Sequence, residues 1–381
     1  MRCCNVKTRV MSLGILFVLF LSVTQAAKAD FVFGEPENLG PTVNSPYFEG
    51  VFDISSDGME LYFCSDRPGG LGGDDLWVTT RTSVTDPWEP PVSLEAPVNS
   101  SYGEGALCIS HDGLSLYFGS GRPGGSGAWD LYVTTRASLE GPWGDPVNLG
   151  AAINSTSDES SPSISSDGLT LYFQSDRPGG AGGIDLYVAT RDAVSDPWGL
   201  AANLGPTVNH PGNDNFPSIS DDGLWLYFSH FFPNTVELWV TRRTSISDPW
   251  SQPVDLGWVA VSPRFSADGS VMYIGSHEYG SYGGGDLFQV SVQPIVDFNG
   301  DGSLDCVDIC DLVDHWGTDI SLYDIGPMPW GDGVVNVEDL IVLAEHIAAN
   351  TVDVNDVSDL KPIKTRLQPR RGAVRQKEGV L

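Results

Sequence analysis

Residues 55–81 read SSDGMELYFCSDRPGGLGGDDLWVTTR, and the rest of the chain repeats this stretch. Its Asp-Gly pair recurs as Asp57-Gly58, Asp112-Gly113, Asp167-Gly168, Asp222-Gly223 and Asp268-Gly269. Successive pairs lie 55, 55, 55 and 46 residues apart. Five copies at a nearly fixed period are the signature of a repeat architecture, so the repeat decides the fold.

Each unit contains four short segments with strand character. In the first unit these are residues 49–55, residues 60–65 after the Asp57-Gly58 turn, residues 75–81 after a glycine-rich loop, and a final W-x-x-P-x-x-L segment. Alternating apolar residues between Gly, Pro and Asp clusters are typical of β-strands. Four antiparallel strands per unit form one propeller blade, so residues 30–294 are predicted to form an all-β, five-bladed β-propeller.

The N-terminal segment is predicted to close the ring. Residues 33–40 read FGEPENLG and match WGDPVNLG at residues 143–150, although no unit precedes them. The fifth unit ends near Gln293 without a fourth strand of its own. If residues 33–40 supply that strand, the first and last segments share a blade and no sheet edge stays open.

The pattern S-x-D-G-x-x-L-Y-F-x-S-D-R-P-G-G-x-G-x-x-D-L-Y-V resembles the WD-like repeats of TolB-type propellers, which are common in bacterial envelope and exported proteins. The resemblance covers residues 31–293 and implies the fold. It implies function only broadly, because such propellers serve as protein-interaction platforms, sugar binders and occasional enzyme scaffolds.

Residues 1–29 are predicted to be a cleaved signal peptide. Basic residues precede an apolar run at residues 11–23, and Ala27-Lys28-Ala29 forms an A-x-A cleavage site. The alternative, a membrane anchor, is weaker because the run is shorter than the roughly 20 residues of a membrane span. The mature protein is therefore expected to be secreted, or to reside in the periplasm or cell envelope, after cleavage near Ala29.

The charge is strongly acidic, with a formal net charge of −30. No lysine lies between Lys28 and Lys361. The resulting negative electrostatic field disfavours binding of nucleic acid and favours binding of cations, neutral ligands or basic partners. Seven of the 20 basic residues lie in residues 351–381, which lack periodicity and are predicted to be a disordered tail.

Residues 297–308 read DFNGDGSLDCVD and match a calcium loop. Oxygen ligands fall at positions 1, 3, 5, 7, 9 and 12, and Gly302 provides the sharp turn at position 6. The predicted ligands are Asp297, Asn299, Asp301, the carbonyl of Ser303, Asp305 and Asp308. A final Asp followed by an apolar helix resembles the type I dockerin repeat.

A second, degenerate loop follows and completes a predicted two-helix, dockerin-like domain over residues 295–350. Asp332, Asn336 and Asp339 match ligand positions, but Met328 and Trp330 occupy two positions where an oxygen ligand is needed. Calcium binding by this second loop stays open. The dockerin resemblance implies calcium as cofactor, a cohesin-like or other envelope or secreted partner, and a setting of extracellular polysaccharide breakdown.

When the units are aligned on their Asp-Gly turns, two sets of polar residues occupy equivalent positions before the turn, and we call each set a column. The acidic column contains Glu49, Glu104, Glu159 and Asp214, and the fifth unit has Ala260 there. The asparagine column contains Asn44, Asn99, Asn154 and Asn209. If the first strand of each blade lines the axis, these side chains meet at one mouth of the channel, where they would bind a cation or sugar hydroxyls. The alternative is that each acid caps a turn or pairs with one of the repeat's own arginines, Arg67, Arg122 and Arg177.

These patterns favour a non-catalytic binding or interaction propeller that is tethered through the calcium module. The alternative is a propeller glycoside hydrolase or lyase that uses the acidic column at the channel mouth. Near-equivalent carboxylates do not offer the unlike environments that an acid and a base require. The question of catalysis stays open on the sequence alone.

Overall fold

The computed structural model describes residues 31–233, 235–267, 269–277, 279, 281–294, 298, 304, 306–317, 334–335 and 337–351. The predicted signal peptide lies outside these residues, and so does the predicted basic tail except for Thr351. The chain divides into two compact units: a propeller of Glu35–Ser266 and Met272–Val290, and a second unit of Asp30–Gly34, Ala267–Val271 and Ser291–Leu381.

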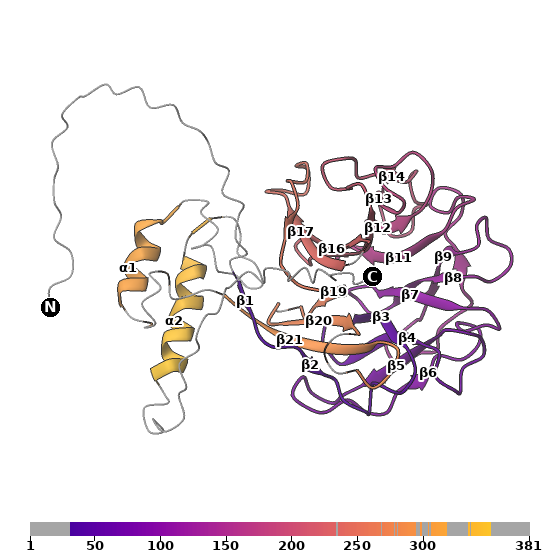
Figure 1. Ribbon diagram of the computed structural model, residues 1–381, viewed down its shortest axis with the longest axis horizontal. Helices are drawn as coiled ribbons and strands as arrows, with labels where there is room; N and C mark the ends of the chain where they lie inside the picture. Colours follow the sequence, from indigo (N-terminus) through magenta and orange to yellow (C-terminus); the bar gives the residue numbers. More distant parts are fainter. Residues whose placement is uncertain are drawn as a thin grey trace, which may run out of the picture. The chain divides into compact units, whose positions relative to one another are not determined.

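The propeller has five blades, as predicted (Figure 1). Blade 1 contains β3 (Glu49–Ile54), β4 (Glu60–Ser65), β5 (Asp75–Thr80) and β6 (Val92–Ser93). Blade 2 contains β7 (Glu104–Ile109), β8 (Ser115–Ser120), β9 (Asp130–Thr135) and β10 (Val147–Asn148). Blade 3 contains β11 (Glu159–Ile164), β12 (Thr170–Ser175), β13 (Asp185–Thr190) and β14 (Ala202–Asn203). Blade 4 contains β15 (Asn213–Ile219), β16 (Trp225–Phe232), β17 (Thr235–Arg242) and β18 (Val254–Asp255).

Blade 5 is built from both ends of the propeller sequence. It contains β19 (Val261–Phe265), β20 (Val271–Ser276) and β21 (Asp286–Pro294), and β2 (Glu37–Asn38) is its outermost strand. Glu37 pairs with Gln289, and Asn38 pairs with Phe288, in antiparallel register. The predicted closure of the ring is therefore confirmed. An additional strand, β1 (Phe31–Phe33), pairs with the end of β21.

The repeated strand sequences are apolar because both faces of each sheet are covered by neighbouring blades. Along β4, Leu61, Tyr62 and Phe63 are all essentially inaccessible to solvent. Tyr62 packs in one cluster with Leu107 and Phe118 of blade 2. A blade thus contributes apolar side chains to both of its neighbours, which explains why a single unit cannot fold alone.

The Asp-Gly turns close each blade's first hairpin. The Asp57 carboxylate accepts hydrogen bonds from the Ser55 hydroxyl and the Met59 amide. Gly58 has a φ of +72°, a left-handed conformation that glycine adopts without steric cost. The S-x-D-G signature therefore encodes a specific turn.

The five innermost strands contact one another in a closed ring around the axis. Each contains a β-bulge, and one residue at or beside each bulge has a positive φ: Val51, Ala106, Ser161, Phe216 and Ser262. Non-glycine residues rarely adopt this conformation. Its recurrence in all five blades shows that the strained bulge belongs to the fold, and it distorts the strands where they line the axis.

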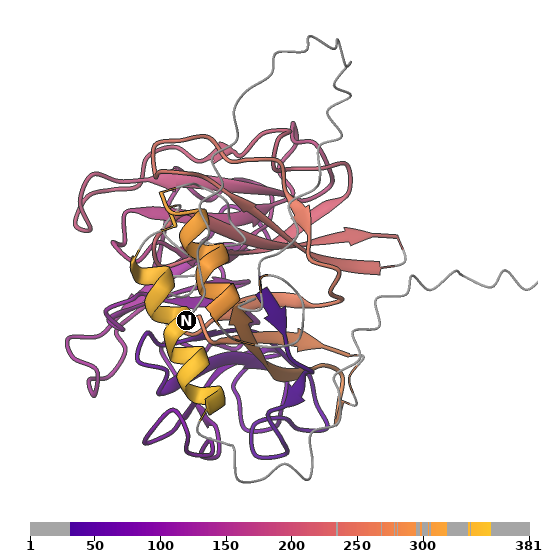
Figure 2. The same cartoon turned by 90° about the vertical axis from the view of Figure 1, so that its left-hand side faces the viewer.

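The second unit contains the two helices α1 (Cys306–Asp314) and α2 (Val337–Thr351), which pack against each other (Figure 2). Leu312 of α1 and Leu343 of α2 are fully buried in one small cluster. Neither helix, among the described residues, has the length and apolar character needed to cross a membrane.

Candidate functional site

The predicted acidic column is buried inside the blades. Glu49 is 1% exposed, and its carboxylate receives hydrogen bonds from the Ser45 amide at 2.7 Å, the Ser65 hydroxyl at 3.0 Å and the Arg67 guanidinium at 2.8 Å. The Ser45 hydroxyl also donates to it. Blade 1 therefore saturates this carboxylate with its own donors.

Blades 2 and 3 repeat this arrangement. Arg122 lies 3.1 Å from Glu104, and Arg177 lies 2.9 Å from Glu159. The pairing with arginine that the sequence offered as an alternative is thus present in three blades. Ligand binding by these carboxylates stays a prediction, and it would require the existing hydrogen bonds to be exchanged.

The predicted asparagine column is also buried and bonded to backbone. The Asn99 amide oxygen accepts the Leu76 N–H at 2.8 Å, and its nitrogen donates to the Leu76 carbonyl at 3.0 Å. Asn44 makes the same pair of bonds with Leu287 of blade 5. Each asparagine thus fastens the loop that leaves a blade to the third strand of that blade, and Asn44 does so across the ring closure.

A cavity of about 340 Å³ opens between the inner strands at one end of the propeller axis. Its lining includes the acidic side chains Asp74, Asp158 and Asp176, the amide Gln174, the hydroxyl residues Ser160 and Ser161, and the aromatic rings Phe48, Trp129 and Phe216. We call this cavity the axial pocket. It combines a few polar groups with apolar walls, which is the usual make-up of a small-ligand site.

The polar groups of the axial pocket occupy positions at which the blades differ. Asp158 stands where blade 1 has Phe48 and blade 2 has Gly103. Trp129 stands where blade 1 has Asp74 and blade 3 has Ile184. These residues are not repeated from blade to blade, so the repeat pattern does not mark them. Their only sequence signal is that the residue type changes between blades at positions next to the buried acids.

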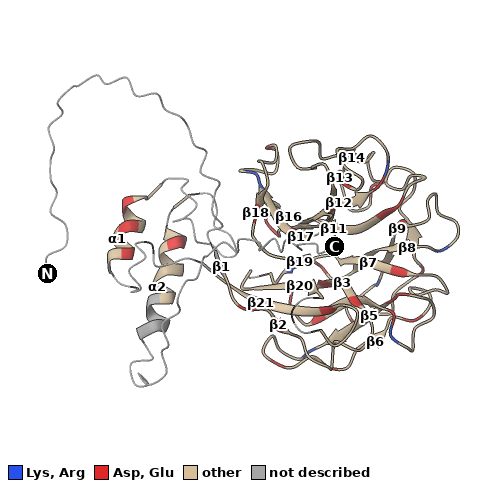
Figure 3. Ribbon diagram, viewed as in Figure 1, with Lys and Arg blue, Asp and Glu red and all other residues tan. Residues whose placement is uncertain are grey.

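Backbone hydrogen bonds hold the pocket acids in place. One Asp158 carboxylate oxygen accepts the Trp129 N–H at 3.0 Å, and the Asp158 N–H donates to Asp176 at 2.9 Å. The Asp74 carboxyl is half-buried, and its pKa is raised, chiefly by burial and further by the nearby Asp66 and Asp75. No lysine or arginine is among the lining residues that the structure describes, and Figure 3 shows acidic residues in several blades. The pocket therefore repels anions.

A buried ion pair crosses the axis just beyond the pocket. Arg264 lies 3.3 Å from Asp53, and it donates to the carbonyls of Pro217 and Pro162 at 3.1 and 3.4 Å. Burial raises the pKa of Asp53 to about 6, while Arg264 opposes that shift. Ser161 lines the axial pocket, and Pro162 is the next residue of the same inner strand. The ion pair therefore lies directly next to the pocket along the axis.

The fourth member of the acidic column has different surroundings. Asp214 accepts the His210 N–H at 2.8 Å and contacts the His230 ring at 2.6 Å. Burial raises the pKa of Asp214, although both interactions oppose the shift. The last asparagine, Asn209, bonds to Leu186 like its counterparts.

Two of the predicted calcium ligands lie among the described residues. Asp308 and Asp339, the last residues of the two loops, are both fully buried near the helix starts. The Phe298 N–H donates to Asp308 at 2.9 Å. The other predicted ligands lie outside the described residues: Asp297, Asn299, Asp301, Ser303, Asp305, Asp332 and Asn336. Two buried carboxylates at equivalent loop positions are compatible with a cation site, and calcium binding stays a prediction.

The two cysteines of the propeller do not form a disulfide bond. Cys64 and Cys108 are buried free thiols. Cys64 lies at the wall of the axial pocket, and burial raises the pKa of its thiol to about 12. A thiol with so high a pKa is a poor nucleophile at neutral pH, so Cys64 is a structural residue.

Similar solved structures include a TolB protein and two α-L-arabinofuranosidases. TolB from Acinetobacter baumannii is 15% identical, with a TM-score of 0.43, over 67% of this chain and 56% of that chain. The GH62 α-L-arabinofuranosidase catalytic domain of Coprinopsis cinerea is 11% identical, with a TM-score of 0.46, over 68% of this chain and 97% of that chain. The α-L-arabinofuranosidase of Podospora anserina, solved with cellotriose, is 12% identical, with a TM-score of 0.43, over 70% and 98% of the two chains.

No protein-family model matches the chain. No curated protein matches it in sequence either.

Proposed function

We propose that this protein is an exported, non-catalytic binding propeller that holds a neutral carbohydrate in its axial pocket. The observation that carries the proposal is the composition of that pocket. A partly exposed indole, Trp129, lies beside carboxylate, amide and hydroxyl groups in a cavity of about 340 Å³. This volume falls within the range of small-ligand sites, about 300 to 1,000 Å³.

The pocket chemistry selects among ligand classes. The apolar face of a sugar ring packs well against an indole, and sugar hydroxyls donate to carboxylates such as Asp158 and Asp176. The Ser161 hydroxyl is buried at the pocket wall without a hydrogen-bond partner in the protein, so a ligand hydroxyl would satisfy it. Acidic polysaccharides would be repelled by the three aspartates.

The test compares two tryptophans in different settings. Trp129→Ala should abolish binding of neutral oligosaccharides in calorimetry while the protein stays folded. Trp198→Ala is the control, because Trp198 stacks under Arg191 at 4.2 Å and lies away from the pocket lining. Equal retention of binding by both variants would disprove the axial pocket as the site.

The calcium module is proposed to tether the propeller to a cohesin-like or other secreted partner. Asp301→Ala in the full chain should remove one calcium-binding event in calorimetry, because the residue occupies position 5 of the complete loop. Asp332→Ala, at the same position of the degenerate loop, is the matched comparison. If wild type binds no calcium, or if Asp301→Ala binds as wild type does, the tether proposal fails.

One observation favours a glycoside hydrolase as second candidate. The pocket carboxylates are in unlike environments, since Asp74 is half-buried with a raised pKa and Asp158 is exposed. Unlike carboxylates are what an acid and its partner base or nucleophile require. Turnover of a plant or algal polysaccharide by wild type, lost in both Asp74→Asn and Asp158→Asn, would establish this activity in place of simple binding.

A further inference from the structure

Blade 4 replaces the hydrogen-bonding network around the buried acid of blades 1 to 3. In those blades a glutamate is bonded by two serines and an arginine. In blade 4 the equivalent positions hold a shorter acid, two histidines and an apolar ring: Asp214 for Glu49, His210 for Ser45, His230 for Ser65 and Phe232 for Arg67. Together, these four replacements remove the arginine that neutralises the buried acid and place two imidazole rings in blade 4.

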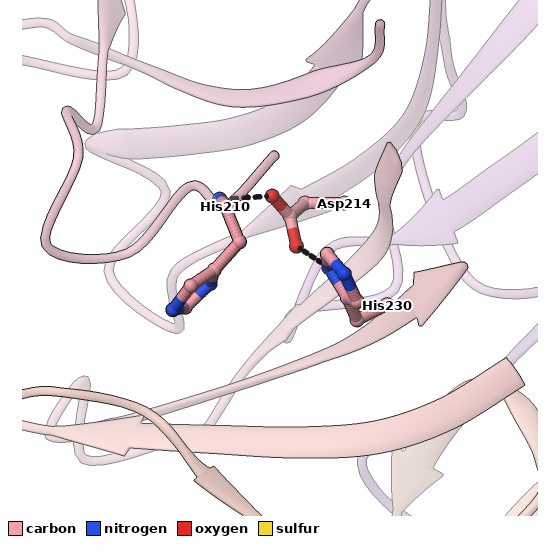
Figure 4. A group of neighbouring side chains, drawn as sticks. All are labelled: His210, Asp214 and His230. Carbon is pink, nitrogen blue, oxygen red and sulfur yellow. Dashed lines mark hydrogen bonds and ion pairs between the residues drawn. The ribbon is translucent and has the colours of Figure 1, made fainter. Parts of the chain in front are cut away.

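The three polar replacements are close neighbours in blade 4 (Figure 4). The Asp214 carboxylate lies between the His210 backbone nitrogen and the His230 ring. One potential ligand atom from each of the three side chains lies within 4.8 Å of the other two. Asp214 and His230 are almost completely inaccessible to solvent.

His210 carries a polar atom that the protein leaves unsatisfied. Its Nδ1 atom is buried and has no hydrogen-bond partner. The His210 ring packs 5.2 Å from Trp239 and 5.7 Å from His230, between ring centroids. An unpaired polar atom in such an apolar setting is unfavourable unless a ligand occupies it.

We propose that His210, Asp214 and His230 bind a divalent transition metal of the zinc type, with one nitrogen from each histidine and one oxygen from the aspartate. Zinc bonds of about 2.0 to 2.2 Å place tetrahedral ligand atoms roughly 3.3 to 3.6 Å apart. The present spacing therefore needs only small movements of side-chain ends. Imidazole nitrogen favours zinc-type ions over calcium, whose ligands are oxygens.

This site is distinct from the axial pocket and from the calcium loop, because none of its residues lines the pocket. Metal binding through Nδ1 of His230 would replace its hydrogen bond with Asp214 by two metal bonds, and the single ring proton of the neutral imidazole would then lie on Nε2. Three protein ligands leave a fourth position for water, as in other open zinc sites.

The experiment titrates the EDTA-treated full-length protein with Co²⁺ and Zn²⁺ in excess Ca²⁺. The expected result is one Co²⁺ per chain with the intense visible absorption of tetrahedral coordination, displaced by Zn²⁺. The key variants carry the residues of the sister blades, His210→Ser and His230→Ser, and each should weaken Zn²⁺ affinity by about 100-fold. His111→Ser, which changes an exposed histidine of blade 2, should bind as wild type does.

A combined variant guards against misfolding. His210→Ser, Asp214→Glu, His230→Ser and Phe232→Arg together restore the network of blades 1 to 3, so this protein should fold without binding Zn²⁺. Thermal unfolding of wild type should shift upward with Zn²⁺, and that of the combined variant should not. Absence of tetrahedral Co²⁺ absorption in wild type, or unchanged Zn²⁺ affinity in the folded variants, would overturn the proposal.

Discussion

At the scale of single residues, the partners of a carboxylate decide its role in this protein. Glu104 is fully buried and bonded to Arg122, whereas Asp158, one blade further on, is exposed at the axial pocket. Both are acids near the mouth of the axis. Only the second is placed to meet a ligand without losing an existing ion pair.

Replacement of a buried acid should therefore damage stability. Glu104→Ala should lower the free energy of unfolding by about 3 kcal/mol, because Arg122 keeps its charge in a largely buried position without its partner. Denaturant unfolding measures the loss, and the exposed Glu140→Ala should stay within about 0.5 kcal/mol of wild type. Unchanged stability together with lost ligand binding would instead make Glu104 a binding residue.

Asp53 should give a distinctive pH dependence. Its pKa is raised to about 6 by burial, so the native state holds a proton that the unfolded chain releases near pH 4. The contribution of Asp53 to stability should fall as pH rises from about 4 to 6, by a total of about 3 kcal/mol, and stay constant above that.

The measurement is the difference in unfolding free energy between wild type and Asp53→Asn at several pH values. The exposed Asp86 is the comparison, because the Thr82 and Ser83 hydroxyls lower its pKa. The difference for Asp86→Asn should therefore have the opposite sign, with stability lost as pH falls. A flat difference for Asp53→Asn between pH 4 and 7 would contradict the raised pKa.

At the scale of elements, an arginine and a tryptophan join adjacent blades. Arg191 of blade 3 stacks at 4.2 Å over Trp198 and donates to the Tyr117 hydroxyl of blade 2 at 3.2 Å. Blades 1, 2 and 4 repeat the stacking, with Arg81 on Trp88, Arg136 on Trp143 and Arg243 on Trp250. The D-P-W and G-P-W turns therefore serve blade packing rather than ligand binding.

Loss of one such contact should cost measurable stability. Arg191→Ala should lower the unfolding free energy by about 1 to 2 kcal/mol, through the lost stacking and hydrogen bonds. Arg242→Ala is a suitable control because Arg242 is exposed and lies over Trp225 of its own blade at 5.6 Å. Equal losses in thermal and denaturant unfolding would show that Arg191 does not join blades.

At the scale of the whole propeller, stability depends on closing the ring. The Asn38 side chain donates to Asp286 of blade 5 at 2.7 Å, and its amide oxygen accepts from Asn44 at 2.8 Å. The closing strand is only two residues long, so these side-chain bonds reinforce a short ladder.

Removal of the closing strand should destabilise the propeller. A chain that begins after Gly40 should unfold about 5 to 10 °C lower than wild type, because β21 loses its outer partner and Asn44 loses Asn38. A chain that ends at Thr351 should keep the wild-type unfolding temperature of the propeller. Calorimetry would contradict ring closure as a source of stability if the two truncations behaved alike.

The sequence alone determined the number of blades, their strand order and the N-terminal closure. Each of these depends on a local pattern, such as the Asp-Gly turn or the W-x-x-P-x-x-L strand, which five-fold repetition makes legible. The sequence also named the arginine partners of the buried acids as one of two alternatives, since both partners recur at fixed spacing.

Only the tertiary structure decided where a ligand could enter and which residues meet there. Asp74, Trp129 and Asp158 come from three different blades, and each differs in residue type from its counterparts in the other blades, so the closed ring alone brings them together. His210 and His230 likewise stand where blades 1 to 3 have serine, and only the folded blade 4 shows that both lie next to Asp214. The turns and strands of each blade depend on local sequence patterns, and the repeats make these patterns recognisable. The candidate sites form where the repeats differ in sequence and where residues from separate strands meet in the folded ring.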